Sequence, residues 1–136
     1  MKYALLSSIV SLFATLSSPA ANAHEGHDKT PGSAAAPHGG VVKGSEHIYL
    51  ELVTDQGGVK LYPLDHEMKA VPMKDLKIEG KMSKPRTKKT EPVKIVVEDD
   101  HYDARIPAKG LNRYDLDLAV THAAKTEKIK FSVEPL

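Results

Sequence analysis

The histidines are the residues of this chain whose type and spacing could support chemistry. Five of the seven histidines fall in the first half of the sequence, and these are His24, His27, His38, His47 and His66. His66 lies between Asp65 and Glu67, so carboxylates accompany the imidazoles. Neutral imidazole nitrogen and carboxylate oxygen are common ligands of zinc and copper. The pattern predicts a metal site, and the alternative is a set of solvated surface histidines.

Sulfur ligands are restricted by the absence of cysteine from the whole sequence. This excludes both disulfides and thiolate metal sites. Thioether sulfur remains available from Met68, Met73 and Met82 and would suit Cu(I). Three methionines at irregular spacing are more typical of core packing. We therefore expect a divalent metal held by imidazole and carboxylate, copper or zinc first, with nickel or cobalt as alternatives.

Motifs for other kinds of chemistry are missing from the sequence. It contains no G-x-S-x-G, S-x-x-K or H-E-x-x-H motif and no phosphate-binding glycine loop. We therefore expect a protein that is not an enzyme. The formal net charge is only +1, which provides no global field to attract nucleic acid. We expect no nucleic-acid partner.

The N-terminal residues have the pattern of a secretory signal peptide. A lysine at position 2, an apolar stretch over 4–16 and the small-residue site Ala21-Asn22-Ala23 predict a signal peptide over 1–23. The stretch is shorter than the roughly 20 apolar residues of a membrane span. We expect periplasmic localisation and no membrane insertion after cleavage. His24 would then begin the chain, and with His27 it could chelate Cu(II); a copper enzyme with an N-terminal histidine brace is one alternative.

Beyond the signal peptide the sequence predicts two parts. Residues 24–37 hold small residues and two prolines without apolar periodicity, which predicts a flexible histidine-containing arm. From His38 onward the apolar residues recur with a period of two. The segments with this pattern are 46–53, 59–64, 76–82, 93–98, 101–106, 114–121 and 129–133. Their regular spacing predicts an all-β domain over 38–136, an antiparallel, Ig-like β-sandwich of about seven strands.

These strands limit which ligands can share one ion. Positions two apart on a strand are about 6.6 Å apart, so His47 and Glu51 would lie about 13 Å apart on one polar face. Each would need partners from another element. A hairpin across Gly57-Gly58 would return His66 to the start of the His47 strand, and His38 approaches the same end.

We therefore expect His38, His47 and His66 to form one cluster. Asp65 and Glu67 are its carboxylate options. Such a site would be open to solvent rather than closed around a structural ion.

Several stretches of the domain also carry a family resemblance. They are Pro37-His38-Gly39-Gly40-Val41-Val42, the strand from His47 to Val53, Val59-Lys60-Leu61-Tyr62, Asp65, Lys69-Ala70-Val71-Pro72 and Lys130-Phe131-Ser132-Val133. Over about residues 37–134 the chain resembles small periplasmic metal-binding domains. Those domains occur free or attached to the adaptor (membrane fusion) subunits of heavy-metal efflux pumps of the resistance-nodulation-division class.

The resemblance implies a β-sandwich that binds metal in the periplasm or delivers it to components of an efflux system. The matching site positions are His38, His47, Glu51 and His66. The hairpin and lipoyl-like parts of the adaptors have no counterpart here, so we expect a stand-alone chaperone or buffer in heavy-metal resistance. The alternative is a non-metal, Ig-like interaction module that docks a periplasmic protein through its sheet edge or the basic loop over 81–89.

Overall fold

The computed structural model describes residues 36–136 of the chain. The signal peptide expected over 1–23 and the arm histidines His24 and His27 lie outside the described residues. Within 36–136, no helix has the length and apolar character needed to cross a membrane.

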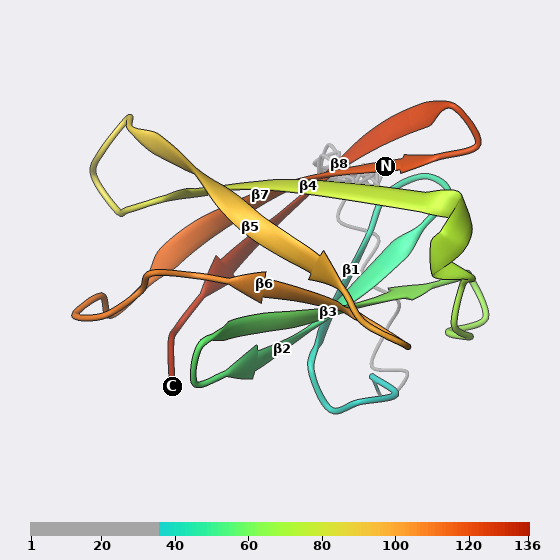
Figure 1. Ribbon diagram of the computed structural model, residues 1–136, viewed down its shortest axis with the longest axis horizontal. Coiled ribbons are helices and arrows are strands. Elements are labelled where there is room, and N and C mark those ends of the chain that lie inside the picture. Colours follow the sequence, from blue (N-terminus) through green and yellow to red (C-terminus); the bar gives the residue numbers. More distant parts are fainter. Residues whose placement is uncertain (1–35) are drawn as a thin grey trace, which may run out of the picture.

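The described residues form eight antiparallel strands joined by short connections (Figure 1). The strands are β1 (Val41–Gly44), β2 (Tyr49–Asp55), β3 (Gly58–Leu64), β4 (Leu76–Ser83), β5 (Thr90–Val97), β6 (Tyr102–Arg105), β7 (Tyr114–His122) and β8 (Lys125–Val133). A short 3-10 turn, η1 (Met73–Asp75), precedes β4. The strands pair in the order β1-β2-β3-β6-β5-β4-β7-β8.

The sheet curls because β5 pairs with one neighbour, β4, along its first residues and with another, β6, along its last residues. The first residues of β5 pair with β4, as in Gly80 opposite Val93, and the later ones pair with β6, as in Val97 opposite Tyr102. Figure 1 shows β5 running diagonally from beside β4 to beside β6. The two ends of the strand order, β1 and β8, contact one another, so the sheet is a nearly closed barrel. The predicted all-β, antiparallel fold is confirmed, whereas the division into a seven-stranded sandwich is not.

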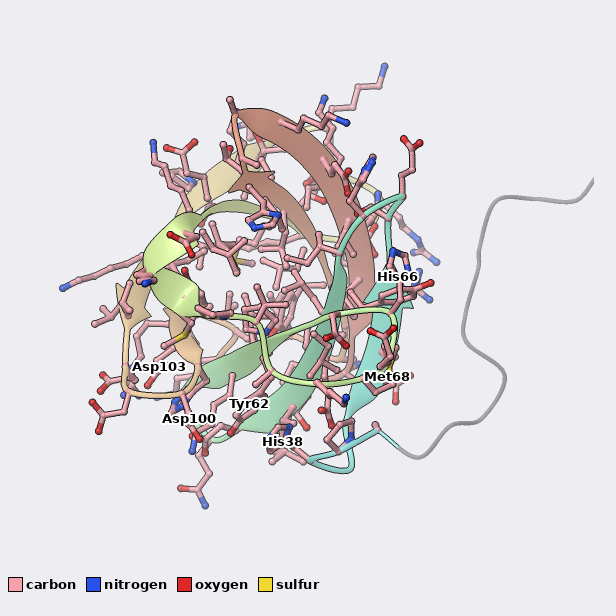
Figure 2. The ribbon with its side chains drawn as sticks, turned by 90° about the vertical axis from the view of Figure 1, so that its right-hand side faces the viewer. His38, Tyr62, His66, Met68, Asp100 and Asp103 are labelled. Carbon is pink, nitrogen blue, oxygen red and sulfur yellow. The ribbon has the colours of Figure 1, made fainter. Side chains whose placement is uncertain are left out.

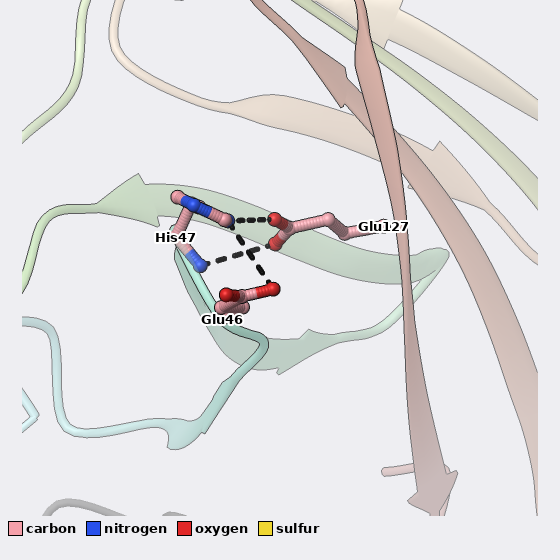
Figure 3. Close-up of side chains that lie close together, drawn as sticks. All are labelled: Glu46, His47 and Glu127. Carbon is pink, nitrogen blue, oxygen red and sulfur yellow. Dashed lines mark hydrogen bonds and ion pairs between the residues drawn. The ribbon is translucent and has the colours of Figure 1, made fainter.

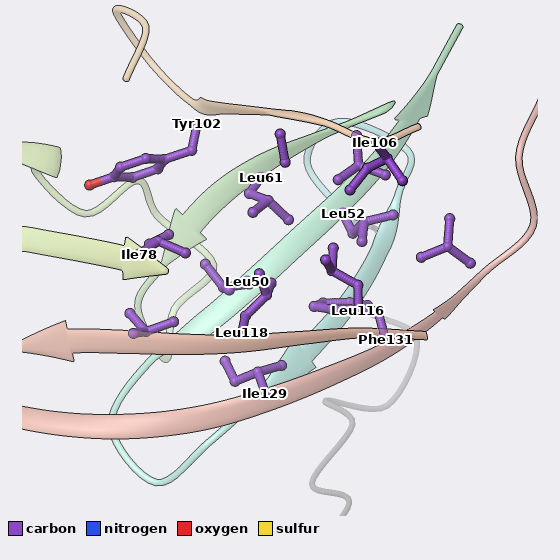
Figure 4. Packing of buried hydrophobic residues seen from close by; sticks show 14 of the residues in the cluster. Leu50, Leu52, Leu61, Ile78, Tyr102, Ile106, Leu116, Leu118, Ile129 and Phe131 are labelled. Atoms are coloured by element: carbon purple, nitrogen blue, oxygen red, sulfur yellow. The ribbon is translucent and has the colours of Figure 1, made fainter. Parts of the chain in front are cut away.

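The barrel interior is filled by the inward side chains of the alternating strands (Figure 4). Among the most buried are Leu50, Leu61, Leu116, Leu118 and Phe131, each with 2% or less of its surface exposed. Met82 is buried in the same core and Met73 packs against it. Tyr102 and Tyr114 are buried too, as expected for packing residues. Two of the three candidate thioethers therefore fill space in the core.

Strand β2 differs from its prediction because both of its faces are covered. Glu51 was expected on a solvent-exposed polar face, but none of its surface is exposed. The residues just before β1 fold over this face, and Gly40 fits there because a Cβ would overlap the carbonyl oxygen of Leu52. His47 precedes β2, and 45% of its side chain is exposed whereas Glu51 is fully buried. The alternation was identified correctly, but the covering segment comes from elsewhere in the chain.

Candidate metal centre

A group of three metal-ligating side chains forms where the connection from β1 to β2 meets β8 (Figure 3). Glu46, His47 and Glu127 each offer a ligand atom, and these atoms all lie within 4.8 Å of one another. His47 Nδ1 lies 2.5 Å from Glu127 Oε1 and 3.9 Å from Glu46 Oε2. We call these three residues the clasp.

Local structure brings the clasp residues together from two elements. The β7–β8 hairpin turns at Ala123-Ala124, so β8 begins at Lys125, four residues before the strand expected from the sequence, and Glu127 becomes part of it. On the other side, the Ser45 hydroxyl shares its single proton between two acceptors, the carbonyl of Ile48 and the carboxylate of Glu127. This tight connection directs the following residues of the chain toward β8.

The electrostatics of the clasp keep Glu127 ionised. Partial burial works toward a higher pKa for Glu127, but hydrogen bonds from Ser45 and from the ring and backbone of His47 outweigh it. The net effect is a pKa below the ordinary value for this carboxyl. Glu46 and His47 are exposed at 85% and 45% of their side-chain surface, whereas Glu127 is exposed at 15%. The clasp is therefore anchored on one side and open on the other.

His38 and Glu51, two of the predicted ligands, bind each other. Glu51 Oε1 accepts hydrogen bonds from the backbone N–H groups of His38 (2.8 Å) and Gly40 (2.9 Å), and its Oε2 lies 2.8 Å from His38 Nδ1. A buried carboxylate with these partners holds the loop before β1 on the sheet. A carboxylate on Nδ1 also favours the tautomer that leaves Nε2 as a lone-pair donor. Glu51 therefore acts as an orienting group, while His38 keeps a free ring nitrogen.

Sequence reasoning missed His101, which lies beside His38 and Tyr62 on the outer face of the barrel. The ring of His38 stacks on Tyr62 with 3.7 Å between ring centroids (Figure 2). The centroid of the His101 ring lies 5.2 Å from that of Tyr62. His101 Nδ1 is 2.6 Å from Asp100 Oδ1, and this hydrogen bond lowers the pKa of Asp100. The Asp100-His101 pair in the sequence could have indicated a second carboxylate-oriented imidazole.

His66, the third member of the expected cluster, has a different neighbour. Its ring meets the edge of the Tyr49 ring at 5.3 Å. Asp65, proposed as a carboxylate option, accepts backbone hydrogen bonds from Glu67 and Lys69 and so stabilises the turn after β3. These contacts describe a structured turn on the outer surface.

The structure therefore does not bring His38, His47 and His66 together. Among residues 36–136, the clasp is the group of three histidine and carboxylate side chains whose ligand atoms lie close enough together to share one ion. Of the predicted ligands, only His47 belongs to it. Glu46 could have been found as the neighbour of His47, but Glu127 lies 80 residues further along the chain in a lysine-rich strand. Only the closing of the barrel places it there.

Comparison of the chain with protein-family models, with curated proteins and with solved structures found no match in any of the three.

Proposed function

We propose that this protein reversibly binds a divalent transition-metal ion at the clasp. The observation that carries the proposal is the convergence of one imidazole and two carboxylates within 4.8 Å, from two separate elements. Two carboxylate ligands, from Glu46 and Glu127, supply the charge that balances a divalent cation. The carboxylates of Glu46 and Glu127 alone would repel each other, but the imidazole of His47 contacts both.

The donor set favours zinc or copper(II). Imidazole suits zinc, copper and nickel, whereas calcium and magnesium take many oxygen ligands and Cu(I) prefers sulfur. Ligand atoms around a tetrahedral ion lie about 3.3 Å apart, given bonds of about 2.0 Å. The exposed side chains of Glu46 and His47 need to move by only about 1 Å to reach this geometry from their present separations.

Binding at the clasp would replace the contact between His47 Nδ1 and Glu127 Oε1. With Nδ1 as the ligand atom, the neutral imidazole carries its proton on Nε2 and offers the ion the Nδ1 lone pair. Three protein ligands leave a fourth position for water or for the ligand of a receiving protein. Such an open position allows exchange of the ion, as a carrier or buffer requires.

The biological setting of the proposal comes from the sequence. We infer a periplasmic chaperone or buffer for heavy-metal resistance, which passes its ion to a component of an efflux system. The signal-peptide pattern and the resemblance to efflux-associated domains support this setting. His24, His27, His38 and His66 remain proposed additional ligands, outside the clasp.

Calorimetric titration of the purified protein with Zn(II) and Cu(II) tests the proposal. Because His24 and His27 can bind metal themselves, the titration is made with both replaced by alanine. In that background, His47→Ala should weaken binding by at least about tenfold, since even residues that merely orient a ligand cost 10- to 100-fold. His101→Ala is the matched control, because this imidazole contacts Tyr62 and Asp100 rather than the clasp and should leave the affinity unchanged.

Two results would count against the clasp. Binding that is weaker than about 10 μM for every divalent transition metal would exclude it as a carrier site. Binding that survives His47→Ala but is lost in His38→Ala and His66→Ala would move the site to the outer face of the barrel. Without metal binding, the non-metal interaction module becomes the better interpretation.

A further inference from the structure

The barrel has one seam, between the two edge strands β1 and β8. Every other pair of neighbours in the strand order is joined by an antiparallel ladder of backbone hydrogen bonds. β1 and β8 lie against one another, but among the described residues no such ladder joins them. Side chains must therefore hold the seam.

The polar contacts across the seam converge on one carboxylate. Glu127 of β8 accepts hydrogen bonds from the Ser45 hydroxyl and from the His47 backbone N–H (3.3 Å), and it pairs with the His47 ring. The other contact is the Lys43 ammonium, 5.8 Å above the ring of Phe131. Because the Ser45 and His47 contacts all involve Glu127, a change in this carboxylate affects these contacts together.

Strand β1 is the weaker side of the seam. It is only four residues long, it pairs with β2 alone, and Val41 exposes 56% of its surface. Short edge strands with few buried contacts open locally at much lower free energy than core strands. Opening at this place requires loss of the Glu127 contacts but of no backbone ladder between β1 and β8.

We infer that the metal ion bound by the clasp locks this seam. The inference rests on the proposed function, because the ion's ligands are the clasp residues. Glu46 and His47 come from the β1–β2 connection and Glu127 comes from β8, so one ion held by all three joins the two edges of the barrel. A ligand that binds only the closed form stabilises that form by its differential affinity. Metal loading is therefore coupled to closure of the barrel at β1 and β8.

Hydrogen-exchange mass spectrometry with and without Zn(II) tests the coupling, and calorimetry on the same samples measures binding independently. At zinc concentrations 100 times Kd, exchange through seam opening should slow by up to about 100-fold. The protected amides should be those that pair β1 with β2 and β8 with β7, since each edge strand is freer to leave its partner once the seam is open. Peptides from the β3–β6 pair, on the far side of the strand order, should show little change.

Two variants separate the ion from the protein's own contacts. Glu127→Gln keeps the size of the side chain but removes a ligand charge, so zinc should bind weakly and protect neither strand. Ser45→Ala removes a seam hydrogen bond without removing a ligand, so metal-free exchange at β1 and β8 should accelerate and zinc should restore protection. Glu79→Gln is the matched control, because this exposed carboxylate lies on β4 and pairs with Lys77.

The outcomes distinguish the inference from the proposed function. Zinc that binds with an affinity dependent on Glu127, yet leaves exchange at β1 and β8 unchanged, overturns the seam lock and leaves the metal site standing. Equal slowing in all strands also overturns it, because zinc would then stabilise the fold as a whole. No zinc binding in calorimetry overturns both.

Discussion

Glu51 is a carboxylate with no exposed surface, and its neighbours compensate for the loss of hydration. Two backbone N–H groups and the His38 ring reach its two oxygens. Hydrogen bonds to a charged group contribute about 1.5 to 3 kcal/mol each, and a buried donor left without its partner costs about 1 to 3 kcal/mol. Glu51 and the loop from His38 to Gly40 therefore hold each other in place.

Replacement of Glu51 should measure this interdependence. Glu51→Ala removes the acceptor of the partly buried His38 and Gly40 N–H groups and of the His38 ring, so the free energy of unfolding should fall by about 3 to 5 kcal/mol. Glu51→Gln keeps one acceptor oxygen and should cost about 1 to 2 kcal/mol. Urea denaturation measures both values, with exposed Glu98→Ala as the control at under about 0.5 kcal/mol. A Glu51→Ala loss no larger than the control's would show that the loop does not depend on this carboxylate.

The same residues show which parts of the site could be predicted. The residue types of the clasp match those expected from composition, since imidazole and carboxylate remain as candidate ligands once cysteine is absent. Glu51 was mistaken for a surface ligand because its alternation matches an exposed face, and its cover comes from residues 11 to 13 positions earlier in the chain. Glu127 could not be foreseen at all, because its contact with His47 depends on barrel closure.

At the scale of elements, hairpins with ordinary turn residues were predictable and the others were not. The Gly57-Gly58 turn joins β2 to β3 as expected, and Tyr114 to His122 alternates along β7 as its pattern indicates. β1 was missed because it is only four residues long and includes a glycine. The start of β8 was placed too late because its turn, Ala123-Ala124, lacks the Asn-Gly signal that such turns usually carry.

The Ala123-Ala124 turn stores strain that a substitution can release. Both residues have positive φ, 48° and 63°, as a two-residue type I′ turn requires. A left-handed conformation costs an alanine about 1 to 2 kcal/mol relative to glycine. Ala124→Gly should therefore raise the free energy of unfolding by about 1 kcal/mol, although glycine also makes the unfolded chain more flexible.

Thermal unfolding followed by circular dichroism measures this gain. A stabilisation of about 1 kcal/mol should raise Tm by roughly 4 °C or more in a domain of this size. Ala70→Gly is the matched control, because Ala70 is also exposed but has no positive φ. It should lower stability slightly. If both variants lowered Tm equally, the turn at Ala123-Ala124 would carry no strain.

At the scale of the whole molecule, the eight strands form a single unit with a shared core. The strand order runs without interruption from β1 to β8, and the clasp lies where that order fails to close. A metal ion held between the two edge strands would act where the barrel opens locally, at β1 and β8. A site in the middle of a ladder would add little to contacts that the backbone already makes.

The free energy of unfolding of the whole barrel should also depend on alkaline pH, because two of its buried residues are tyrosines. Tyr114 exposes 1% of its surface, and burial raises its pKa to about 12 from the ordinary value of 10.0. Burial raises the pKa of Tyr102 as well, and its hydroxyl shares its one proton between the carbonyls of Met73 and Leu76. Both phenols are buried in their neutral form, so the folded barrel resists their ionisation.

The sign of the effect follows from proton binding. Below pH 10, Tyr114 is protonated in both the folded and the unfolded chain, and its contribution does not vary with pH. Between pH 10 and 12 the unfolded chain loses this proton while the folded chain retains it, so the free energy of unfolding falls as the pH rises. By pH 12 the loss from this one group should reach about 2 kcal/mol.

Tyr114→Phe isolates that contribution from the other groups that titrate in alkali. The variant removes the ionisable hydroxyl but keeps the ring that packs in the core, so its stability near pH 8 should stay close to that of the natural chain. Urea denaturation from pH 8 to 12 should then show a shallower decline for the variant, with the two curves diverging above pH 10. Parallel curves over that range would mean that Tyr114 ionises as readily in the barrel as in the unfolded chain.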